Sequence, residues 1–168
     1  MSAPNPRRVA LVTGSSRGLG AAIARRLARD GLAVAVNGTR IDGPAADVVA
    51  AIRADGGTAE AFAADVTDER SVQRLVADVA GRLGPIDVLV LNATGPQPEA
   101  PIEDVTWDDH LAQLDFFVRS PVLLAHAVVG SMRSRGYGRI VQIDSEVVDR
   151  PPPGRSAYVT AKSAQIGL

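Results

Sequence analysis

Short apolar runs alternate with amphipathic segments along almost the whole chain. Residues 9–12 and 32–36 are continuous apolar runs with the length of a buried parallel strand, and residues 58–64, 86–91 and 140–143 are three further strand candidates. Between these runs, hydrophobic residues recur at the spacing of one helix face, most clearly at positions 72, 75, 76, 79 and 83. Strands that alternate with helices predict an α/β fold, in which a doubly wound parallel sheet carries a layer of helices on each face.

Capping residues and proline set the expected helix boundaries. Residues 47–55 are predicted to form the second helix, and Thr67 or Asp68 is the expected N-cap of the third. A long helical region covers residues 107–135 and contains Pro121. We expect a kink or a break there, because proline disfavours the helical conformation of the residue before it.

The composition is that of an ordinary globular protein. A length of 168 residues suits a single domain, and the shares of hydrophobic (46%) and charged (22%) residues are typical of a packed, soluble chain. The formal net charge of -1 gives no electrostatic reason to expect binding to nucleic acid or to an anionic membrane. The chain contains no cysteine, which excludes disulfides, thiolate catalysis and cysteine metal sites.

No metal site, leader or membrane span is expected from the sequence. His110 and His126 fall on the long predicted helix without a suitably spaced carboxylate, so we interpret both as solvated or packed residues rather than metal ligands. Residues 1–8 are polar and include two prolines, which is unlike a signal peptide, and no continuous apolar run reaches membrane-spanning length. The expected location is the cytoplasm.

Residues 13–20, with the sequence TGSSRGLG, connect the first predicted strand to the first predicted helix. A helix N-terminus offers free N–H groups and a partial positive charge to a pyrophosphate, and glycine allows close approach of the backbone. An ordinary tight turn is the alternative, because turns everywhere use glycine and serine. The position of the string between a strand and an amphipathic helix favours binding of a nucleotide.

Polar residues follow three of the later strands, at the edge of the sheet where ligands bind in such folds. Asp65 follows the third strand, Asn92 the fourth and Ser145 the fifth. Each also has an ordinary structural interpretation: a cap for Asp65, a turn residue for Asn92 and a loop hydroxyl for Ser145.

Tyr158 and Lys162 are four residues apart on the last predicted helix and share one face. A tyrosine ordinarily has a pKa near 10, too high for efficient proton exchange at neutral pH, and a nearby ammonium favours the phenolate. The pair could therefore serve as an acid/base device, although taken alone a surface pair is the first interpretation, since any helix can contain this spacing by chance.

Taken together and in this order, the glycine string, Asp65, Asn92-Ala93 and Ser145 thirteen residues before Tyr158-x-x-x-Lys162 resemble the short-chain dehydrogenase/reductase family. The resemblance covers nearly the whole chain. It implies one Rossmann-like domain over residues 1–168 that binds a nicotinamide cofactor and transfers a hydride to a ketone or from a secondary alcohol.

The resemblance also implies a role for individual residues. Tyr158 would be the general acid/base, Lys162 would hold the nicotinamide ribose and lower the tyrosine pKa, and Ser145 would donate a hydrogen bond to the substrate oxygen. The residues implied in cofactor binding are Gly14, Ser16, Arg17, Gly18, Leu19, Gly20, Arg40, Asp65, Val66, Asn92, Ala93, Thr94, Tyr158 and Lys162.

The choice between the two nicotinamide cofactors follows from charge. A carboxylate at the end of the second strand would bind the 2′-hydroxyl of NAD, but this segment reads Asn37-Gly38-Thr39-Arg40. Arg17 and Arg40 could both face a 2′-phosphate, so NADP(H) is expected in preference to NAD(H). The alternative is that both arginines are solvated surface residues.

The chain departs from the family pattern at three points. Thr94 stands where the family has glycine, and glycine comes one place later, at Gly95. The helical asparagine of the family's proton relay is absent from residues 114–117, where Asp115 is the only polar side chain. The resemblance also implies further strands and a substrate flap after Leu168, so we expect a truncated chain.

These departures leave a second hypothesis open, a nicotinamide-binding module without catalysis that acts as a sensor or a partner subunit. The enzyme is favoured by the presence of Ser145, Tyr158 and Lys162, because a pure binding module does not need the serine at that spacing. Relatives commonly pair through the long helices, so a homo-oligomer is expected, although the apolar residues 122–129 suit ordinary core packing equally well. The substrate, a small carbonyl or alcohol, cannot be named more closely from the sequence.

Overall fold

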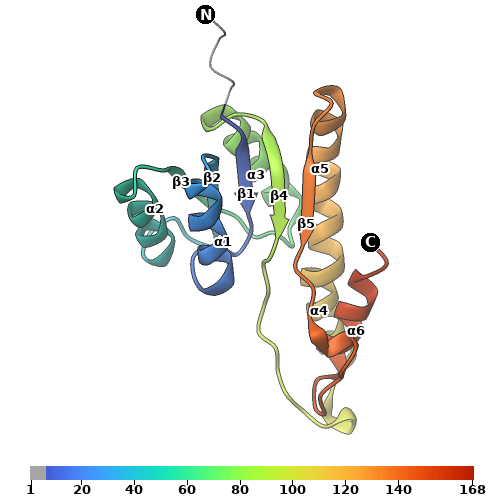
Figure 1. Ribbon diagram of the computed structural model, residues 1–168. Helices are drawn as coiled ribbons and strands as arrows, with labels where there is room; N and C mark the ends of the chain where they lie inside the picture. Colours follow the sequence, from blue (N-terminus) through green and yellow to red (C-terminus); the bar gives the residue numbers. More distant parts are fainter. Residues whose placement is uncertain (1–6) are drawn as a thin grey trace, which may run out of the picture.

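The computed structural model describes residues 7–168, so the polar segment 1–6 lies outside the described residues. Five strands form a parallel sheet in the order β3-β2-β1-β4-β5 (Figure 1). They are β1 (Val9–Val12), β2 (Ala33–Gly38), β3 (Thr58–Ala63), β4 (Ile86–Leu91) and β5 (Arg139–Gln142). The predicted doubly wound sheet is confirmed. After β3 the chain crosses back to the other side of β1, and the crevice between β1 and β4 is where such sheets bind ligands.

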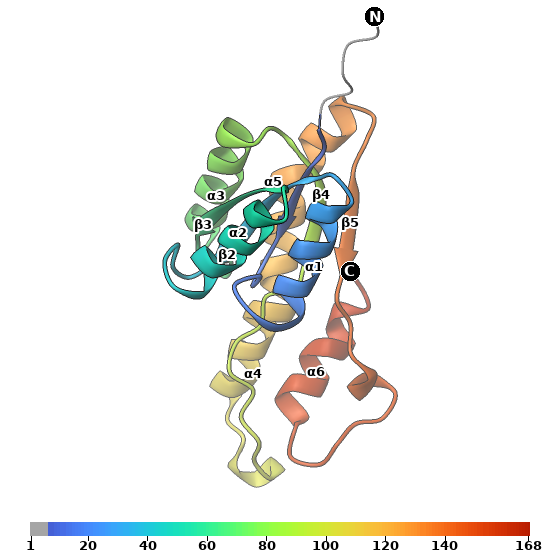
Figure 2. The same cartoon turned by 60° about the vertical axis from the view of Figure 1, so that its left-hand side comes forward.

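Helices cover both faces of the sheet (Figures 1 and 2). The helices are α1 (Gly18–Arg29), α2 (Pro44–Ala54), α3 (Glu69–Arg82), α4 (Trp107–Leu114), α5 (Ser120–Ser134) and α6 (Ser156–Gln165). Buried residues of α1 and α2 pack on one face of the sheet, and those of α3 and α5 pack on the other. The core therefore has two apolar layers, one on each side of the strands.

The central strand shows why the apolar runs are continuous rather than alternating. Val9 and Leu11 belong to the apolar layer beneath α3 and α5, whereas Ala10 and Val12 belong to the layer beneath α1 and α2. Successive side chains of a strand point to opposite faces, so a strand that is covered on both faces must be apolar at every position.

Two helix starts show how local residues set the boundaries. Asp68, one of the two residues predicted, is the N-cap of α3, and its carboxylate accepts a hydrogen bond from the Ser71 N–H at 2.7 Å. The second helix begins at Pro44, three residues before the predicted start. Proline is favoured in the first turn of a helix because its missing N–H would have no intrahelical partner there.

Of the expected kink or break at Pro121, the break is absent; the irregularity lies just before the proline, as a π turn at Asp115–Arg119. The N–H of Ser120 donates to the carbonyl of Asp115, five residues earlier, and α5 continues straight through Pro121. Proline is tolerated here because the wider turn changes the bonding pattern just before it.

The continuous helical run Trp107–Ser134 is long and apolar enough to cross a membrane, judged by length and composition alone. Leu124, Val128 and Met132 from this run are buried against the sheet. The apolar character of the run is therefore explained, on this side, by packing in the core of the fold.

Candidate active site

The glycine-rich turn after β1 is attached to the end of β2. The Ser15 hydroxyl donates to the Val12 carbonyl at 2.6 Å and accepts from the Asn37 N–H at 3.0 Å. The Asn37 side-chain oxygen accepts from the Gly14 N–H at 3.2 Å. Since Asn37 and Ser15 are both buried, these bonds fix the path of the backbone before α1 begins.

The glycines of this turn are required by close packing. A Cβ on Gly20 would lie 2.5 Å from the Gly14 carbonyl oxygen and 2.6 Å from the Asn92 side-chain nitrogen. Gly14 itself has a positive φ of 61°, which side chains disfavour. Arg17 is the N-cap of α1, but its side chain makes no capping bond, so the N–H groups of the first turn are open to a ligand.

The end of β4 is joined to the end of β1 through Thr13. The buried Thr13 hydroxyl donates to the Val90 carbonyl at 3.2 Å and accepts from the N–H groups of Asn92 and Ala93 at 3.0 and 3.1 Å. The Asn92 side-chain nitrogen returns two bonds, to the carbonyls of Thr13 and Gly14. The two loops at the centre of the sheet's carboxyl edge are therefore held together by side-chain hydrogen bonds.

A groove of about 660 Å³ runs over this edge. Of the residues expected to bind cofactor, eleven line it: Gly14, Ser16, Arg17, Gly18, Leu19, Gly20, Asp65, Val66, Asn92, Ala93 and Thr94. The structure thus brings together residues from the loops after β1, β3 and β4 that are far apart in the sequence.

Asp65 has a structural role as well as a place in the groove. One of its carboxylate oxygens accepts from both the N–H and the hydroxyl of Thr67, at 2.9 and 2.7 Å. This closes a local turn ahead of α3. Val66 beside it is buried in the core, so the loop after β3 has a fixed shape where it borders the groove.

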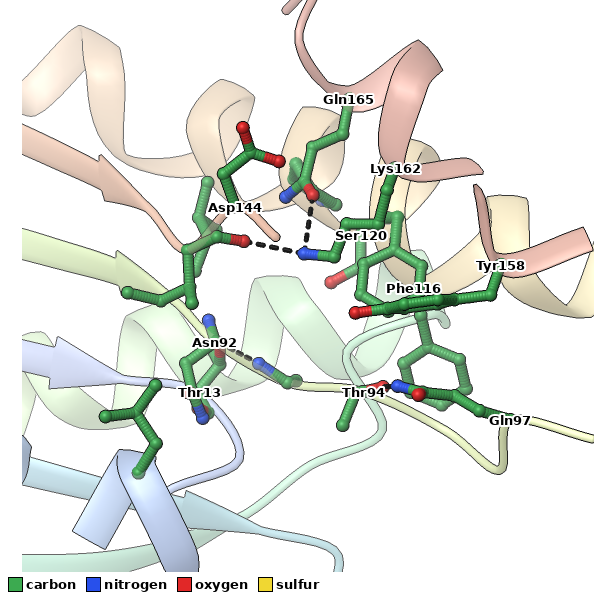
Figure 3. A pocket seen from close by; sticks show the side chains of 16 residues that line it. Thr13, Asn92, Thr94, Gln97, Phe116, Ser120, Asp144, Tyr158, Lys162 and Gln165 are labelled. Carbon is green, nitrogen blue, oxygen red and sulfur yellow. Dashed lines mark hydrogen bonds between the residues drawn. The ribbon is translucent and has the colours of Figure 1, made fainter. Parts of the chain in front are cut away.

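A second cavity, of about 290 Å³, contains the tyrosine and the lysine (Figure 3). Tyr158 and Lys162 enter it from α6. Five residues line both this cavity and the groove: Leu19, Asn92, Ala93, Thr94 and Phe116. The acid/base pair and the glycine-rich turn therefore lie on either side of a shared wall.

Lys162 is only 4% exposed. Its ammonium contacts two oxygen atoms and one aromatic ring. Its Nζ donates to the Ile143 carbonyl at 2.6 Å and to the Gln165 side-chain oxygen at 2.8 Å. Nζ also lies 4.3 Å from the centroid of the Phe117 ring. Burial lowers the pKa of Lys162, and the nearby Asp144 carboxylate partly opposes this.

The Tyr158 ring packs edge-on against Phe117, with 5.3 Å between ring centroids and 69° between ring planes. Edge-to-face packing of this kind restrains the ring without using its hydroxyl. Phe117 therefore touches both members of the pair, the tyrosine at its ring and the lysine at its ammonium.

Ser145 is not among the residues that line the groove or the cavity. Its hydroxyl accepts a hydrogen bond from the Val147 N–H at 3.4 Å, at the start of the short 3-10 turn Glu146–Val148. Asp144, one residue earlier, lines the cavity instead. The structure brings together two members of the expected triad, and the role of Ser145 stays a prediction.

Residues 8–168 match the family described as short chain dehydrogenase. The chain belongs to the short-chain dehydrogenase family. It is 38% identical over 165 residues to the human protein named Dehydrogenase/reductase SDR family member 4, an alignment that covers 98% of this chain and 59% of the human one. The chain thus spans about three fifths of the length of this relative.

Two solved structures of the family are closely similar to this fold. One is a metagenomic short-chain oxidoreductase in complex with NADP, with a TM-score of 0.89 and 32% identity over 96% of this chain and 72% of that one. The other is an NAD+-bound xylitol dehydrogenase, also with a TM-score of 0.89, with 35% identity over 96% of this chain and 62% of that one. The family resemblance inferred from the sequence is confirmed, and a nicotinamide cofactor of either kind is compatible with the fold.

Arg40 lies in a third recess, of about 390 Å³, rather than in the groove of this short-chain dehydrogenase. Ser16, Arg17 and Thr39 line both spaces. The Arg40 guanidinium makes a bidentate pair with Asp42, at 2.9 and 2.8 Å. This pairing raises the pKa of Arg40 and lowers that of Asp42, so the arginine already has a carboxylate partner in the recess.

The displaced glycine after β4 has a packing explanation. A Cβ on Gly95 would lie 2.3 Å from the Phe116 ring, so the ring occupies the space of a side chain. Thr94 is exposed and its hydroxyl accepts from the Gln97 side-chain nitrogen at 2.9 Å. The glycine is therefore needed one place later than the family pattern puts it, and Thr94 borders both the groove and the cavity.

The missing relay asparagine is replaced by an aromatic environment. Asp115, the polar residue of that region, pairs with Arg119 at 3.4 Å and does not line the cavity. Phe117 lines it instead, beside Lys162. The expectation that Asp115 could substitute for the asparagine finds no support in its position.

Two residues at the site carried no recognisable sequence signal: Gln165, which accepts from Lys162, and Gln97, which contacts Thr94. Thr13 and Phe117 lie in stretches that the sequence singled out, but the contacts of their side chains were not predicted. Asn37 had a clue of its own, since a polar residue at the end of a buried strand is unusual.

Proposed function

We propose that this chain forms the cofactor-binding and proton-transferring part of an oxidoreductase that moves a hydride between NADP(H) and a ketone or secondary alcohol. The observation that carries the proposal is the shared wall between the glycine-turn groove and the cavity of Tyr158 and Lys162. Because the chain spans only part of its relatives' length, the activity and substrates of the whole protein belong to this proposal.

The groove offers a partner for each part of a dinucleotide. The uncapped N–H groups at the start of α1 would bind the pyrophosphate, and the close backbone approach at Gly20 keeps side chains out of that place. Asp65 and Val66 also line the groove and would contact the adenine. Asn92, Ala93 and Thr94 would hold the part nearest the cavity.

The bound nicotinamide supplies or accepts the hydride. Tyr158 then gives its hydroxyl proton to the carbonyl oxygen in reduction, or takes it from the alcohol in oxidation. Lys162 serves in this proposal as the positive charge that favours the phenolate and as a donor to the ribose. Phe117 and Phe116 line the cavity in which this proton would move.

Replacement of Tyr158 by phenylalanine tests the enzymatic proposal. Y158F removes the acid/base group and keeps the edge-on contact with Phe117, so turnover of a ketone panel with NADPH should fall by about 10³-fold. The dissociation constant for NADPH should change by less than about tenfold, since a hydrogen bond contributes about 0.5–1.5 kcal/mol net. Tyr137→Phe is the matched control, because Tyr137 contacts Arg8 and Arg139 away from the cavity and is the only other tyrosine.

Ketone reduction that survives Y158F at the wild-type rate would refute the acid/base role. A wild-type protein that binds NADPH but reduces no ketone would favour the second candidate, a nicotinamide-binding module. The position of Ser145 favours this second candidate, because its hydroxyl accepts from the Val147 N–H and does not line the cavity.

The preference for NADP(H) is the finer part of the proposal, and Arg17, Thr39 and Arg40 around the third recess support it. Asp42 opposes it, because its carboxylate would face a 2′-phosphate. Asp42→Asn should therefore improve the preference for NADPH over NADH by roughly fivefold at low salt, and less at high salt. Asp55→Asn, which breaks a similar exposed pair with Arg29, is the control. Tighter binding of NADH than of NADPH to the wild type would overturn the preference.

We also propose a small-molecule carbonyl or alcohol substrate, a cytoplasmic location and a homo-oligomer. Leu124 and Val128 of α5 are used in the core, whereas Val122 is 47% exposed on the opposite side, with Trp107 and Leu111 exposed on α4. These exposed apolar residues support pairing through the long helices. Sedimentation of the protein as a monomer at micromolar concentration would contradict the homo-oligomer.

A further inference from the structure

Lys162 has a distinctive place in both the sequence and the fold. Of the 18 lysine and arginine residues of the chain, it is the only lysine. It is also buried, whereas most of the arginines are exposed. A buried ammonium is stable only where acceptors replace the water that it has lost.

Two of those acceptors come from different elements. The Ile143 carbonyl lies just beyond the end of β5, and the Gln165 side chain lies one turn after Lys162 on α6 (Figure 3). Gln165 is 2% exposed. Its own backbone carbonyl accepts from the Gln142 side chain of β5 at 2.8 Å, so the glutamine is itself fixed to the sheet.

We propose that Gln165 is a positioning residue, which together with the Ile143 carbonyl and the Phe117 ring holds the Lys162 ammonium at one point of the cavity. An ammonium has three N–H donors, and two of them are taken by these oxygens. The remaining donor is left for a ligand in the cavity, while the ring face limits where Nζ can move.

This arrangement differs from the family pattern, in which an asparagine on the long helix extends the proton relay. Instead of a polar group on the long helix, this chain has Phe117 there and a glutamine on the lysine's own helix. The link to catalysis rests on the proposed function, because it assumes that Lys162 acts on a cofactor and on Tyr158. The placement of the ammonium by Gln165 does not depend on that assumption.

The charged form of Lys162 depends on few neighbours. Asp144, from the loop after β5, is the carboxylate that faces it, and Tyr158, from α6, is the other titratable group that lines the cavity. The side-chain oxygen of Gln165 accepts a stronger hydrogen bond from the charged ammonium than from the neutral amine, so it favours the ammonium. Its removal should lower the pKa of Lys162 further, and a carboxylate in its place should raise it.

The single lysine makes this measurable. Protein labelled with [13C]lysine gives one Cε resonance, whose chemical shift against pH reports the pKa of Lys162 in the whole chain. We expect Gln165→Met to lower that pKa by about half a unit or more and Gln165→Glu to raise it by about one. Gln113→Met is the matched control, because Gln113 is equally buried but donates to the Pro96 carbonyl instead of contacting the lysine.

A wild-type pKa in the Gln165→Met protein, or an equal shift in the Gln113→Met control, would overturn the proposal. If Gln165→Met does not fold, Gln165→Glu decides alone, and the absence of a rise refutes the placement. The second readout is the dissociation constant for NADPH. Gln165→Met should raise this constant about fivefold, and Gln165→Glu should leave it near the wild-type value. A wild-type protein that neither binds NADPH nor reduces ketones would refute the proposed function. The titration of Lys162 would still show whether Gln165 positions the ammonium.

Discussion

The buried hydroxyl of Thr13 offers a direct test of how the sheet holds the candidate site together. The hydroxyl is bonded to three backbone groups: it donates to the Val90 carbonyl and accepts from the N–H groups of Asn92 and Ala93. Thr13→Val keeps the branched shape and nearly the same volume, so packing is preserved while all three bonds are lost.

The size of the effect follows from the groups that are left without a partner. An unsatisfied buried donor costs about 1–3 kcal/mol, and the two N–H groups are half-buried, so the lower end applies to each. With the lost bond to Val90, the free energy of unfolding should fall by about 3 kcal/mol. That is a large share of the roughly 5–15 kcal/mol typical of a domain.

Urea denaturation followed by far-UV circular dichroism measures this loss, with the slope against urea as a check on two-state behaviour. Thr13→Ser is the control, because it keeps the hydroxyl and removes one methyl group, for about 1 kcal/mol. If volume rather than hydrogen bonding mattered, the serine variant would be the less stable of the two. That order, or a valine variant within about 0.5 kcal/mol of the wild type, would refute the reasoning.

Two further predictions concern the glycine turn and the lysine. Gly20→Ala should destabilise the protein by at least about 2 kcal/mol and abolish NADPH binding, because the new Cβ would overlap the Gly14 carbonyl. Gly81→Ala is the control in α3, where a Cβ meets no atom within 4 Å, and it should stabilise the protein by about 0.5–1 kcal/mol. Thermal unfolding of both variants checks the pair, and equal effects would contradict the close-packing argument. Burial lowers the pKa of Lys162 from its usual 10.5, so at pH values between the lowered pKa and 10.5 the unfolded chain holds a proton that the folded chain has released. The free energy of unfolding should therefore rise with pH through that window, and Lys162→Met should remove the rise. Urea denaturation at a series of pH values measures this free energy. An unchanged slope of the free energy against pH in the variant would contradict the burial argument.

The strands could be predicted from the sequence because each is a local pattern. The fourth strand has the predicted bounds, Ile86–Leu91. Its one polar residue, Asp87, is buried because its carboxylate pairs with Arg135 and accepts from the Val9 N–H. Those partners are 48 and 78 residues away, so the sequence shows the exception without its cause.

The site divides in the same way. The glycine turn, Tyr158 and Lys162 were predictable because their spacing is short and their chemistry is specific. The direction of the Ser145 hydroxyl was not, since a serine in a loop can point to a ligand or bond to the backbone two residues on, as it does here with the Val147 N–H. Gln165 could not be found either, because its meaning appears only when α6 is placed against the end of β5.

The π turn before α5 gives the long helix an unusual property. A five-residue turn carries one residue more than regular helix needs, and each residue rotates the chain by roughly 100°. Deleting a single residue from Asp115–Arg119 would let the hydrogen-bond ladder become regular, so the helix could survive. Everything upstream would then swing about the axis, and Phe116 would leave the wall that the groove and the cavity share. A change that the scaffold tolerates would thus uncouple the two halves of the site.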